Sequence, residues 1–533
     1  PHNLLLFGHS QRTSDHMSGA DGSAVPNARE RTVDCEVCIL GAGVAGLNAL
    51  FAATRHLSSD QPIVIVDRTA SPAGMWNRTY KYVRLHQPHP TFTAGNISWR
   101  SQRDPYYLAT RTEVVEHLNY CFETLSGRSR IDPHFGYEYV NHEDKGTGDR
   151  PVTVHCRRAS DDQPLTIRAR RLIKAFGYDV KVQPALALSS QTVQSLSPDL
   201  HDLTAPEVRD SDGSIYIVGG GKTGMDTAHL MVRQLPHKRV RMLAGAGTIF
   251  ANRDLAHPRG LRRYWGGVPA LEAFLDTAAR FDGRNEAEVM AYFLRRYGLS
   301  LGPDTRSHTF GVLSPVELSE IRQGLDEVIM DHLVDVVDES NSPTMVLRSG
   351  QRRSIEPGSI IINATGYLLR ENLPYEPLLS ASGNVISIQP TSAIHFLSSQ
   401  AAYFLTHLFL MGELDSVPLY EVDGNELARA SRVVLAPAAM SLTLYNSWHA
   451  MSRLPRWAAR ENGLDFLLLY PTHRRLLAFA RLFTFMKRRP THFTDVMDIV
   501  RDRFEIRLGP FKQADSGQSA VRKGGEREVA GAE

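Results

Sequence analysis

The chain contains 533 residues, of which 42% are hydrophobic and 22% charged, and its formal net charge is +2. Since a single hydrophobic core stops growing at about 250–300 residues, we expect two or more folded domains. The small net charge argues against general nucleic-acid binding, and four cysteines are too few for a disulfide-stapled protein, which favours a cytoplasmic location.

The first recognisable unit follows residues 1–33, which we expect to form a flexible leader. Cys35–Leu40 is an apolar strand, and the sequence GAGVAG that follows it leads into the helix-prone run Leu47–Ala53. The next strand, Ile63–Val66, ends on Asp67. A strand, a glycine-rich turn, a helix, a second strand and an acid at this spacing are typical of a dinucleotide-binding βαβ unit, in which the acid binds the adenosine ribose.

Cys35 and Cys38 have the CxxC spacing of redox motifs. Reactive pairs of this kind lie at helix N-termini, which stabilise the thiolate, whereas these two residues fall in the predicted strand. A dithiol reaction is therefore disfavoured. No Ser-His-Asp set and no cluster of metal-ligand residues stands out in the sequence, so we expect no metal site.

Beyond the first unit, Ala73–Trp76 and Tyr82–Pro88 form an irregular stretch dense in aromatic and hydrogen-bonding groups. Such a stretch is expected of a loop that lines a ring-shaped cofactor. Thr110–Leu125 has the apolar spacing of a helix, and Pro151–Ala175 has the pattern of strands. The first domain is therefore expected to span residues 34–205.

A second glycine-rich sequence, IVGGGKTGMD at residues 217–226, allows two interpretations. Its Gly-Lys-Thr looks like a nucleoside-triphosphate loop, but that loop needs a glycine five residues before the Gly-Lys pair, where Tyr216 stands. The GxGxxG spacing of Gly219, Gly221 and Gly224, directly after an apolar strand, fits a dinucleotide site instead. The sequence thus predicts two Rossmann-like dinucleotide-binding domains in one α/β chain.

The remainder of the second domain is expected to contain strands at Arg239–Leu243 and Met345–Leu347, with a mostly helical insert at 269–325 between them. We place this domain at residues 211–350. A further apolar strand, Ser359–Asn363, then opens a return to the first domain over residues 355–435.

Together these motifs resemble the flavin-containing monooxygenase family over roughly residues 34–420. GAGVAG with its following acid is similar to that family's FAD fingerprint, and Gly74-Met75-Trp76 is similar to its GxW. The LHQP of residues 85–88 resembles the LHLP of the plant auxin-forming members. GGGKTGMD at 219–226 resembles the family's GxGNSGxD, and NATGY at 363–367 resembles its ATGY strand end.

The resemblance implies an NAD(P)H domain inserted into an FAD domain, and an enzyme that uses both cofactors and O₂ to oxygenate a small organic substrate. The FAD contacts that it implies are Gly41, Gly43, Ala45, Gly46, Asp67, Arg68, Gly74, Met75, Trp76, Thr365 and Gly366. The implied NADPH contacts are Gly219, Gly221, Lys222, Thr223, Gly224 and Arg253. The catalytic candidates are Arg84, His86 and Gln87, although an ordinary structural role for His86 stays open.

Cofactor choice depends on the end of the second strand of this domain, Leu243-Ala244-Gly245. It offers no carboxylate to a ribose 2′-hydroxyl, which favours NADPH over NADH. Arg253 and Arg241 are candidate partners of the 2′-phosphate. The alternative is that both arginines are simply solvated.

The sequence departs from the family in one motif. F-x-G-x-x-x-H precedes the family's second glycine loop and helps to hold NADPH, whereas Ser195 and Ser197 stand here in place of its Phe and Gly, ahead of His201. Two other functions therefore stay open. One is an oxidase or dehydrogenase that turns over NAD(P)H without oxygenating a substrate, and the other is a non-catalytic flavin-binding redox sensor.

The last part of the chain is expected to be a helical extension at 436–512 and a disordered tail at 513–533. Nine Lys and Arg residues between Arg453 and Arg489 are interleaved with apolar runs such as Leu476–Met486. An apolar helix with basic flanks can lie on an anionic membrane surface. The alternative is a helix packed over the substrate pocket with solvated arginines, and the sequence leaves the oligomeric state open.

Overall fold

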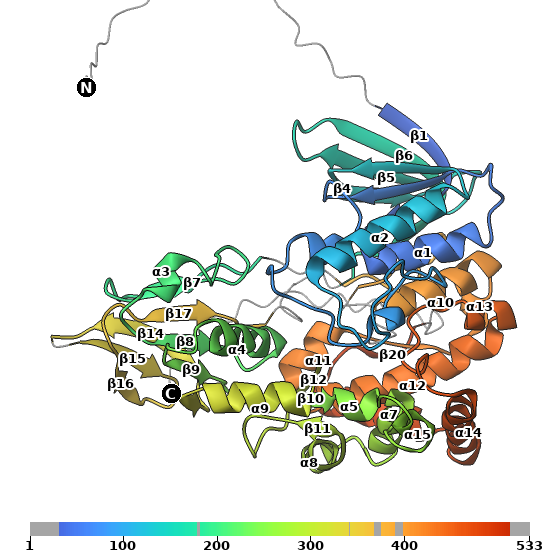
Figure 1. The fold of residues 1–533 in the computed structure, drawn as a ribbon. Coiled ribbons are helices and arrows are strands. Elements are labelled where there is room, and N and C mark those ends of the chain that lie inside the picture. Colours follow the sequence, from blue (N-terminus) through green and yellow to red (C-terminus); the bar gives the residue numbers. More distant parts are fainter. Residues whose placement is uncertain (1–30, 178–181, 341, 367–374, 390–397, 512–533) are drawn as a thin grey trace, which may run out of the picture.

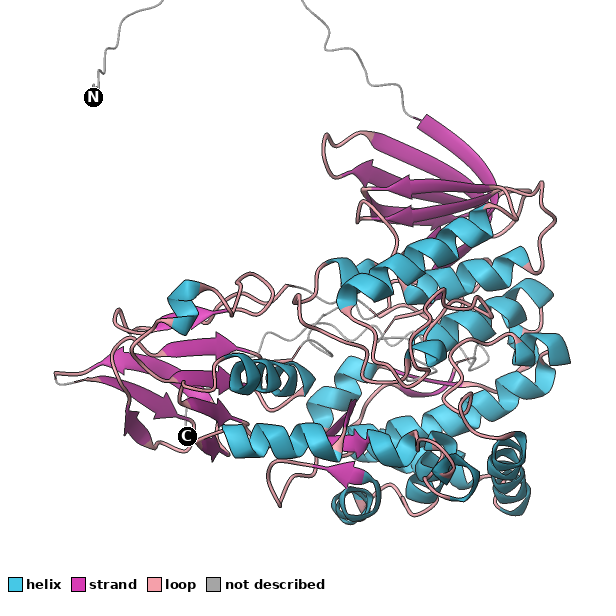
Figure 2. Cartoon of the chain, in the orientation of Figure 1, coloured by secondary structure: helices cyan, strands magenta, loops and turns pink. Residues whose placement is uncertain are grey.

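The computed structural model describes residues 31–177, 182–340, 342–366, 375–389 and 398–511. They form a molecule with an L-shaped outline, in which one β-sheet lies at the end of each arm (Figure 1). Helices fill the corner and the base between the two sheets (Figure 2). The expected tail at 513–533 and most of the expected leader lie outside the described residues.

The first sheet grows from the amino-terminal βαβ unit, β1 (Arg31–Leu40), α1 (Val44–Thr54) and β2 (Ile63–Asp67), whose strands pair in parallel. The strand order is β3-β2-β1-β6-β5-β4, with β18 beside β6. The other strands are β3 (Ile131–Phe135), β4 (Tyr137–Asp144), β5 (Val152–Arg158), β6 (Pro164–Lys174) and β18 (Val385–Ser387). Because β1 pairs with β6 from Arg31 onward, residues 31–33 belong to this sheet and not to the leader.

Three helices lie together against one side of this sheet: α1, α2 (Arg111–Ser126) and α10 (Ser398–Met411) (Figure 1). α2 begins where Thr110 and Glu113 cap each other's backbone N–H groups, which explains why the helix starts at the predicted position. α1 is buried along almost its whole length, and α10 packs closely along it. A dinucleotide loop at the start of α1 therefore stands on a rigid support.

The second sheet is fully parallel, in the order β13-β9-β8-β17-β7. Its strands are β13 (Glu327–Ile329), β9 (Val240–Leu243), β8 (Ile215–Val218), β17 (Ile360–Asn363) and β7 (Gln194–Leu196). Helices α4 (Lys222–Gln234) and α9 (Pro315–Gly324) pack beside it. The expected α/β class with two Rossmann-like sheets is confirmed.

Two of the expected domain boundaries are wrong. β7 lies before residue 205 and β17 lies after residue 355, yet both belong to the second sheet, where β17 pairs with β8 and β7. The chain rejoins the first sheet only at β18. The apolar pattern of 359–363 predicts a strand, but a pattern of this kind carries no information about which sheet the strand joins.

The base of the molecule is a third body, in which the insert and the carboxy-terminal extension share one hydrophobic core. Its main helices are α7 (Ala270–Ala278), α8 (Glu286–Tyr297), α12 (Leu435–Arg453), α14 (Thr472–Arg488) and α15 (His492–Phe504). Strands β10 (Ile249–Asn252), β11 (Gly298–Leu299) and β12 (His308–Leu313) form a small sheet beside them. None of the helices in the described ranges is both long and apolar enough to cross a bilayer.

Candidate cofactor and active site

The first glycine loop joins β1 to α1 and is shaped by close backbone approaches. Gly41 has a φ of +105°, a conformation that favours glycine, and a Cβ on Gly46 would lie 1.8 Å from the Gly41 carbonyl oxygen. Gly43, at the N-cap of α1, faces Gly74, where a Cβ would lie 2.8 Å from the Gly43 Cα. The two segments therefore meet through backbone alone, which leaves the helix N-terminus accessible to a pyrophosphate.

Asp67 fixes the glycine turn to the end of β2 by hydrogen bonds. One carboxylate oxygen accepts the N–H of Ala42 at 2.5 Å, and the other accepts both the N–H and the hydroxyl of Thr69 at 2.7 Å. The side chain lies at the carboxyl end of β2, next to the glycine turn, as the predicted ribose-binding acid requires. Arg68, which follows it, is exposed.

The segment after this unit puts the predicted ring-lining residues next to the loop. Ala73 has a φ of +98°, which is strained for a residue with a Cβ, and its N–H donates to the Ala42 carbonyl. Trp76 is buried and packs against Phe92, whereas Met75 is exposed. Arg111 fixes the turn by donating to the Trp76 carbonyl at 2.8 Å.

The second glycine loop repeats the construction of the first between β8 and α4. Gly219 has a φ of +128°, and a Cβ on Gly224 would lie 1.9 Å from the Gly219 carbonyl oxygen. Gly221 differs, because it has an ordinary φ of −86° and a Cβ there would meet no atom within 4 Å. The space in front of the α4 N-terminus is thus open, which fits a dinucleotide phosphate.

The first turn of α4 carries Lys222 and Thr223. The Lys222 ammonium forms an ion pair with Asp226 one turn later, and the Thr223 carbonyl accepts the hydroxyl of Thr227. Asp226 therefore holds the Lys222 side chain along the helix. Thr365 and Gly366, which follow β17, belong to this second unit, because a Cβ on Gly219 would lie 2.5 Å from the Ala364 carbonyl oxygen. Tyr367 of the ATGY motif lies outside the described residues.

Two tyrosines connect the ring-lining segment to the second unit. The Tyr80 hydroxyl donates to Asp226 at 2.9 Å, and the Tyr82 hydroxyl is 2.6 Å from the Thr227 hydroxyl. Burial raises the pKa of both tyrosines, and the nearby Asp226 raises it further. Since both hydroxyls stay protonated, they fix the helix that follows the second glycine loop against the loop beside the first.

A cluster of polar side chains lies at the same junction. Arg253 forms an ion pair with Glu317 and donates to the His86 carbonyl at 3.5 Å. Burial, reinforced by Lys222 and Arg253, lowers the pKa of His86 to about 3. Burial opposes ionisation of Glu317, but Arg253, the Ser314 N–H and Lys222 together keep the pKa of that carboxyl below its usual value. His86 is therefore neutral at physiological pH, between a lysine and an arginine.

His257 joins this cluster. Burial and the Arg253 charge lower the pKa of His257 to about 4, and within the described part of the chain its buried Nδ1 has no hydrogen-bond partner. An orphaned buried polar atom calls for an explanation, and a bound ligand is one. Sequence reasoning missed both His257 and Glu317. The only sequence signal at Glu317 is its capping box with Ser314, which indicates a helix start and not a site.

The other two catalytic candidates, Gln87 and Arg84, differ in how they are placed relative to the junction. Gln87 is buried beside His86. Arg84 is exposed, and its guanidinium donates to the Leu108 carbonyl at 3.1 Å and lies over the Tyr107 ring. The structure thus brings His86 and Gln87 to the junction but engages Arg84 with the segment before α2.

The residues of β9 and those near its carboxyl end are relevant to the choice between NADPH and NADH. Arg241 points to the start of β8, where it donates to the Tyr216 hydroxyl at 2.6 Å, and this is the end of the sheet opposite the glycine loop. At the glycine-loop end, a Cβ on Gly245 would lie 2.7 Å from the His332 ring. The exposed Arg348 donates its N–H to the His332 carbonyl. Sequence reasoning missed His332 and Arg348 because both lie more than 100 residues beyond the glycine loop.

The cysteine pair has no accessible thiol. Cys35 and Cys38 are free and fully buried, and burial raises the pKa of both thiols, that of Cys35 to about 12. Across the described ranges, no group of three or more His, Cys, Asp or Glu side chains is placed to hold a metal ion.

Comparison with known proteins gives one family match. The sequence model of the pyridine nucleotide-disulphide oxidoreductase family matches residues 35–257, which include both glycine loops. Curated relatives include an uncharacterised protein of Mycobacterium tuberculosis and one of Mycobacterium bovis. Each is 24% identical over 410 residues, which cover 73% of this chain and 69% of the relative.

Solved structures with a similar fold include a flavin-containing monooxygenase from Stenotrophomonas maltophilia, at 16% identity and a TM-score of 0.44, over 71% of this chain and 99% of that one. An ornithine N-hydroxylase from Kutzneria sp. 744 has 14% identity and a TM-score of 0.46, over 72% and 98% of the two chains. A cyclohexanone monooxygenase has 13% identity and a TM-score of 0.46, over 81% and 98%.

Proposed function

We propose that this FAD- and NAD(P)H-dependent oxidoreductase is a monooxygenase, which transfers one oxygen atom of O₂ to a small organic substrate. The observation that carries the proposal is the junction at which Tyr80 and Tyr82, from the loop beside the first glycine turn, bind Asp226 and Thr227 of α4. This contact joins the segment beside the first dinucleotide loop to the helix that follows the second. Hydride transfer between two bound cofactors requires the two sites to be adjacent in this way.

The residues present fit both cofactors. Gly43 and Gly74 provide a side-chain-free approach to the start of α1, and Gly221 provides open space at the start of α4. FAD, when bound, supplies the acceptor for a hydride from the nicotinamide and the group that reacts with O₂. The protein binds the two cofactors, orients their rings and excludes water.

The neutral His86 gives the junction a group that can donate or accept a hydrogen bond without carrying charge. Its pKa of about 3 means that protonation does not change this state above about pH 5. We assign to His86 and the unpartnered Nδ1 of His257 the task of hydrogen bonding to the cofactor ring or the substrate.

NADPH is the proposed electron donor. The end of β9 carries Ala244 and Gly245 and no carboxylate, His332 lies beside Gly245, and Arg348 is in contact with His332. A 2′-phosphate at this position would meet Arg348. We propose Arg348 in place of Arg253, because Glu317 already neutralises the Arg253 guanidinium.

A second candidate function is an NAD(P)H oxidase or dehydrogenase that oxygenates nothing. It is favoured by Ser195 and Ser197, which replace the Phe and Gly of the family motif. The Ser195 hydroxyl accepts the N–H of Leu186 at 2.8 Å, and the Ser197 hydroxyl donates to the Gln183 carbonyl at 2.5 Å. Both hydroxyls are thus bonded to the backbone of the segment that precedes β7.

The proposal is tested by measuring NADPH oxidation by the purified protein with a panel of amines, sulfides and ketones, while oxygenated product and hydrogen peroxide are quantified together. We expect oxygenated product with at least one compound, and peroxide nearly equimolar with NADPH when no substrate is added. Steady NADPH oxidation that yields only peroxide with every compound would select the oxidase. The absence of NADPH oxidation would select the redox sensor.

A further inference from the structure

The helical base carries an apolar surface that the cofactor site does not use. More than half of the large hydrophobic side chains that are exposed in the described residues come from two short stretches, 261–265 and 457–483. Leu261 is 70% exposed and Trp265 71%, and on α14 Leu476 is 64% exposed and Phe483 53%. Exposed aromatic and aliphatic side chains gathered in this way mark an interaction site.

The two stretches form one surface because the start of α14 binds α6 (Arg262–Trp265). The Arg474 guanidinium donates to the carbonyls of Gly266 at 3.0 Å and Gly267 at 3.2 Å. The His473 ring stacks on Tyr264. We call Leu261, Trp265, Leu476, Phe479 and Phe483 the α14 surface.

α14 is apolar on two neighbouring faces, of which one is buried and the other exposed. Ala478, Leu482 and Met486 recur every four residues and are buried against the base. Leu476, Phe479 and Phe483 recur at the i, i+3 and i+7 positions of the other face and are exposed. Packing of the base explains the first stripe but not the second, so the second stripe is available to a partner.

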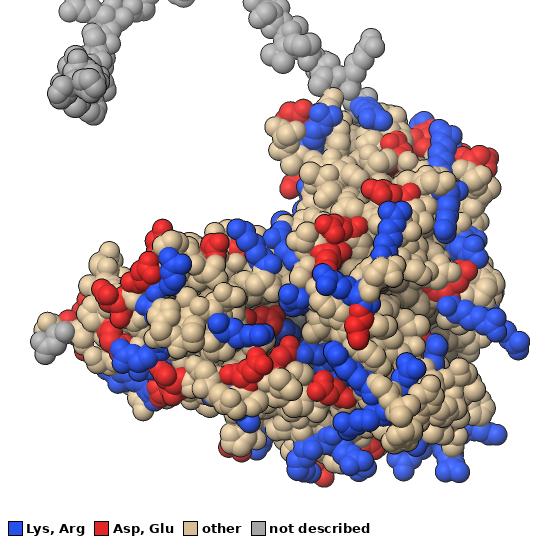
Figure 3. All heavy atoms as spheres, in the orientation of Figure 1, with Lys and Arg blue, Asp and Glu red and all other residues tan. Residues whose placement is uncertain are grey.

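The charge around this surface is basic. Exposed cations lie at the carboxyl end of α14, at Lys487, Arg488 and Arg489. Three more come from the end of α12 and from α13 (Arg456–Arg460), at Arg453, Arg456 and Arg460. The neighbouring acids are already neutralised, since Asp465 pairs with Arg475, Glu461 with Arg55 and Glu272 with Arg481. Lys and Arg side chains accordingly gather along the lower edge of the molecule, where Figure 1 places α7, α15 and α14 (Figure 3).

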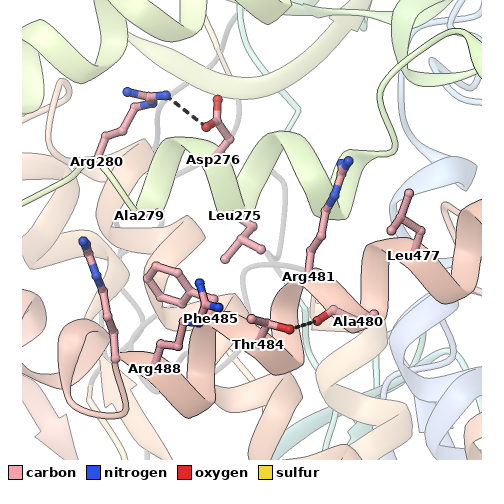
Figure 4. Close-up of a pocket in the computed structure, with 11 residues that line it drawn as sticks. Leu275, Asp276, Ala279, Arg280, Leu477, Ala480, Arg481, Thr484, Phe485 and Arg488 are labelled. Carbon is pink, nitrogen blue, oxygen red and sulfur yellow. Dashed lines mark hydrogen bonds and ion pairs between the residues drawn. The ribbon is translucent and has the colours of Figure 1, made fainter.

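A cavity of about 680 Å³ opens between α7 and α14, with arginines on both sides. Arg280 comes from the end of α7 and is paired with Asp276, while Arg481 and Arg488 come from α14 (Figure 4). Arg488 and Arg489 stand at the last turn of α14 and just beyond it. The cavity is suited to an anionic group, and it is lined by other residues of α14 than Leu476, Phe479 and Phe483.

We propose that the α14 surface docks on an anionic lipid bilayer, with Leu476, Phe479 and Phe483 in the headgroup region and the surrounding arginines on the lipid phosphates. Charge complementarity selects this partner, since a row of apolar side chains flanked by Lys and Arg is the pattern of an interfacial helix. No described helix is suited to cross a bilayer, so the protein would lie on the surface. This inference does not depend on the proposed oxygenation.

The test is cosedimentation of the full chain with vesicles of phosphatidylcholine alone or of phosphatidylcholine mixed with phosphatidylglycerol. We expect binding to the mixed vesicles that weakens as salt rises, and about a ten-fold loss of that binding in Leu476→Ser/Phe479→Ser/Phe483→Ser. Lys487→Gln/Arg488→Gln/Arg489→Gln should lose binding to the mixed vesicles as well. The control, Leu200→Ser/Val334→Ser, changes two side chains that are 60% and 62% exposed on the other arm and should bind as the wild type does.

NADPH oxidation in each variant checks that the chain has folded. Equal binding of wild type and the triple serine variant would overturn the proposal. Equal binding to both kinds of vesicle would overturn the role of charge. A dimer that the serine substitutions abolish, with no vesicle binding by the wild type, would assign the surface to a second copy of the chain instead.

Discussion

At Gly46 a methyl group would lie 1.8 Å from the Gly41 carbonyl oxygen, and at Gly224 one would lie 1.9 Å from that of Gly219. The third glycine of each loop is therefore required by packing, before any cofactor binds. Gly221 is not required in this way. Glycine thus serves two purposes in these loops. At Gly46 and Gly224 it permits close packing of the backbone, whereas at Gly221 it leaves space for a ligand, and only Gly221 is informative about the ligand.

Arg348 carries the prediction on cofactor choice at the scale of single residues. Arg348→Ala should raise the KM for NADPH about ten-fold and leave the KM for NADH unchanged, because it removes one exposed charge-assisted contact to the 2′-phosphate. Steady-state kinetics with both cofactors measure this. Arg352→Ala, which removes an exposed arginine of β16 (Arg352–Ser354), is the control. An equal rise for both cofactors would place the 2′-phosphate elsewhere.

At the scale of elements, the start of α4 gives the most selective test of the second loop. Gly221→Ala adds a methyl group that meets no protein atom, at a backbone φ that any residue adopts. The fold and the bound FAD should survive, while the KM for NADPH rises about ten-fold or more because the methyl group lies where the pyrophosphate approaches. Thermal unfolding, flavin absorbance and kinetics measure the three quantities. Wild-type kinetics would show that no phosphate binds there.

Both βαβ units could be predicted from the sequence, because strand length, glycine spacing and helical periodicity are local properties. The contact between the two units could not be predicted from the sequence. The bond between Tyr80 and Asp226 joins residues 146 positions apart, and β17 joins the second sheet although it follows the insert. The family resemblance indicated His86, but its neutrality follows from Lys222, Arg253 and burial, which only the fold brings together.

At the scale of the whole molecule, each body performs one task. In our proposal the first sheet presents the loop for FAD and the second presents the loop for NADPH, while the helical base carries the α14 surface. The tyrosine contacts to α4 connect the first two bodies to each other, and the ion pair between Arg253 and Glu317 connects the second body to the base. The proposed electron transfer and the proposed membrane contact are therefore located on separate surfaces.

The central claim is that the two glycine loops serve one electron path, from NADPH to FAD. The most direct test is to mix the purified protein with NADPH in the absence of O₂ and to follow the visible absorbance of the flavin. We predict that the protein is isolated with FAD and that NADPH bleaches it fully, whereas Gly221→Ala is bleached only at higher NADPH concentration. A protein that carries FAD but keeps its colour under excess NADPH, or that is isolated without flavin and takes up none, would contradict the account.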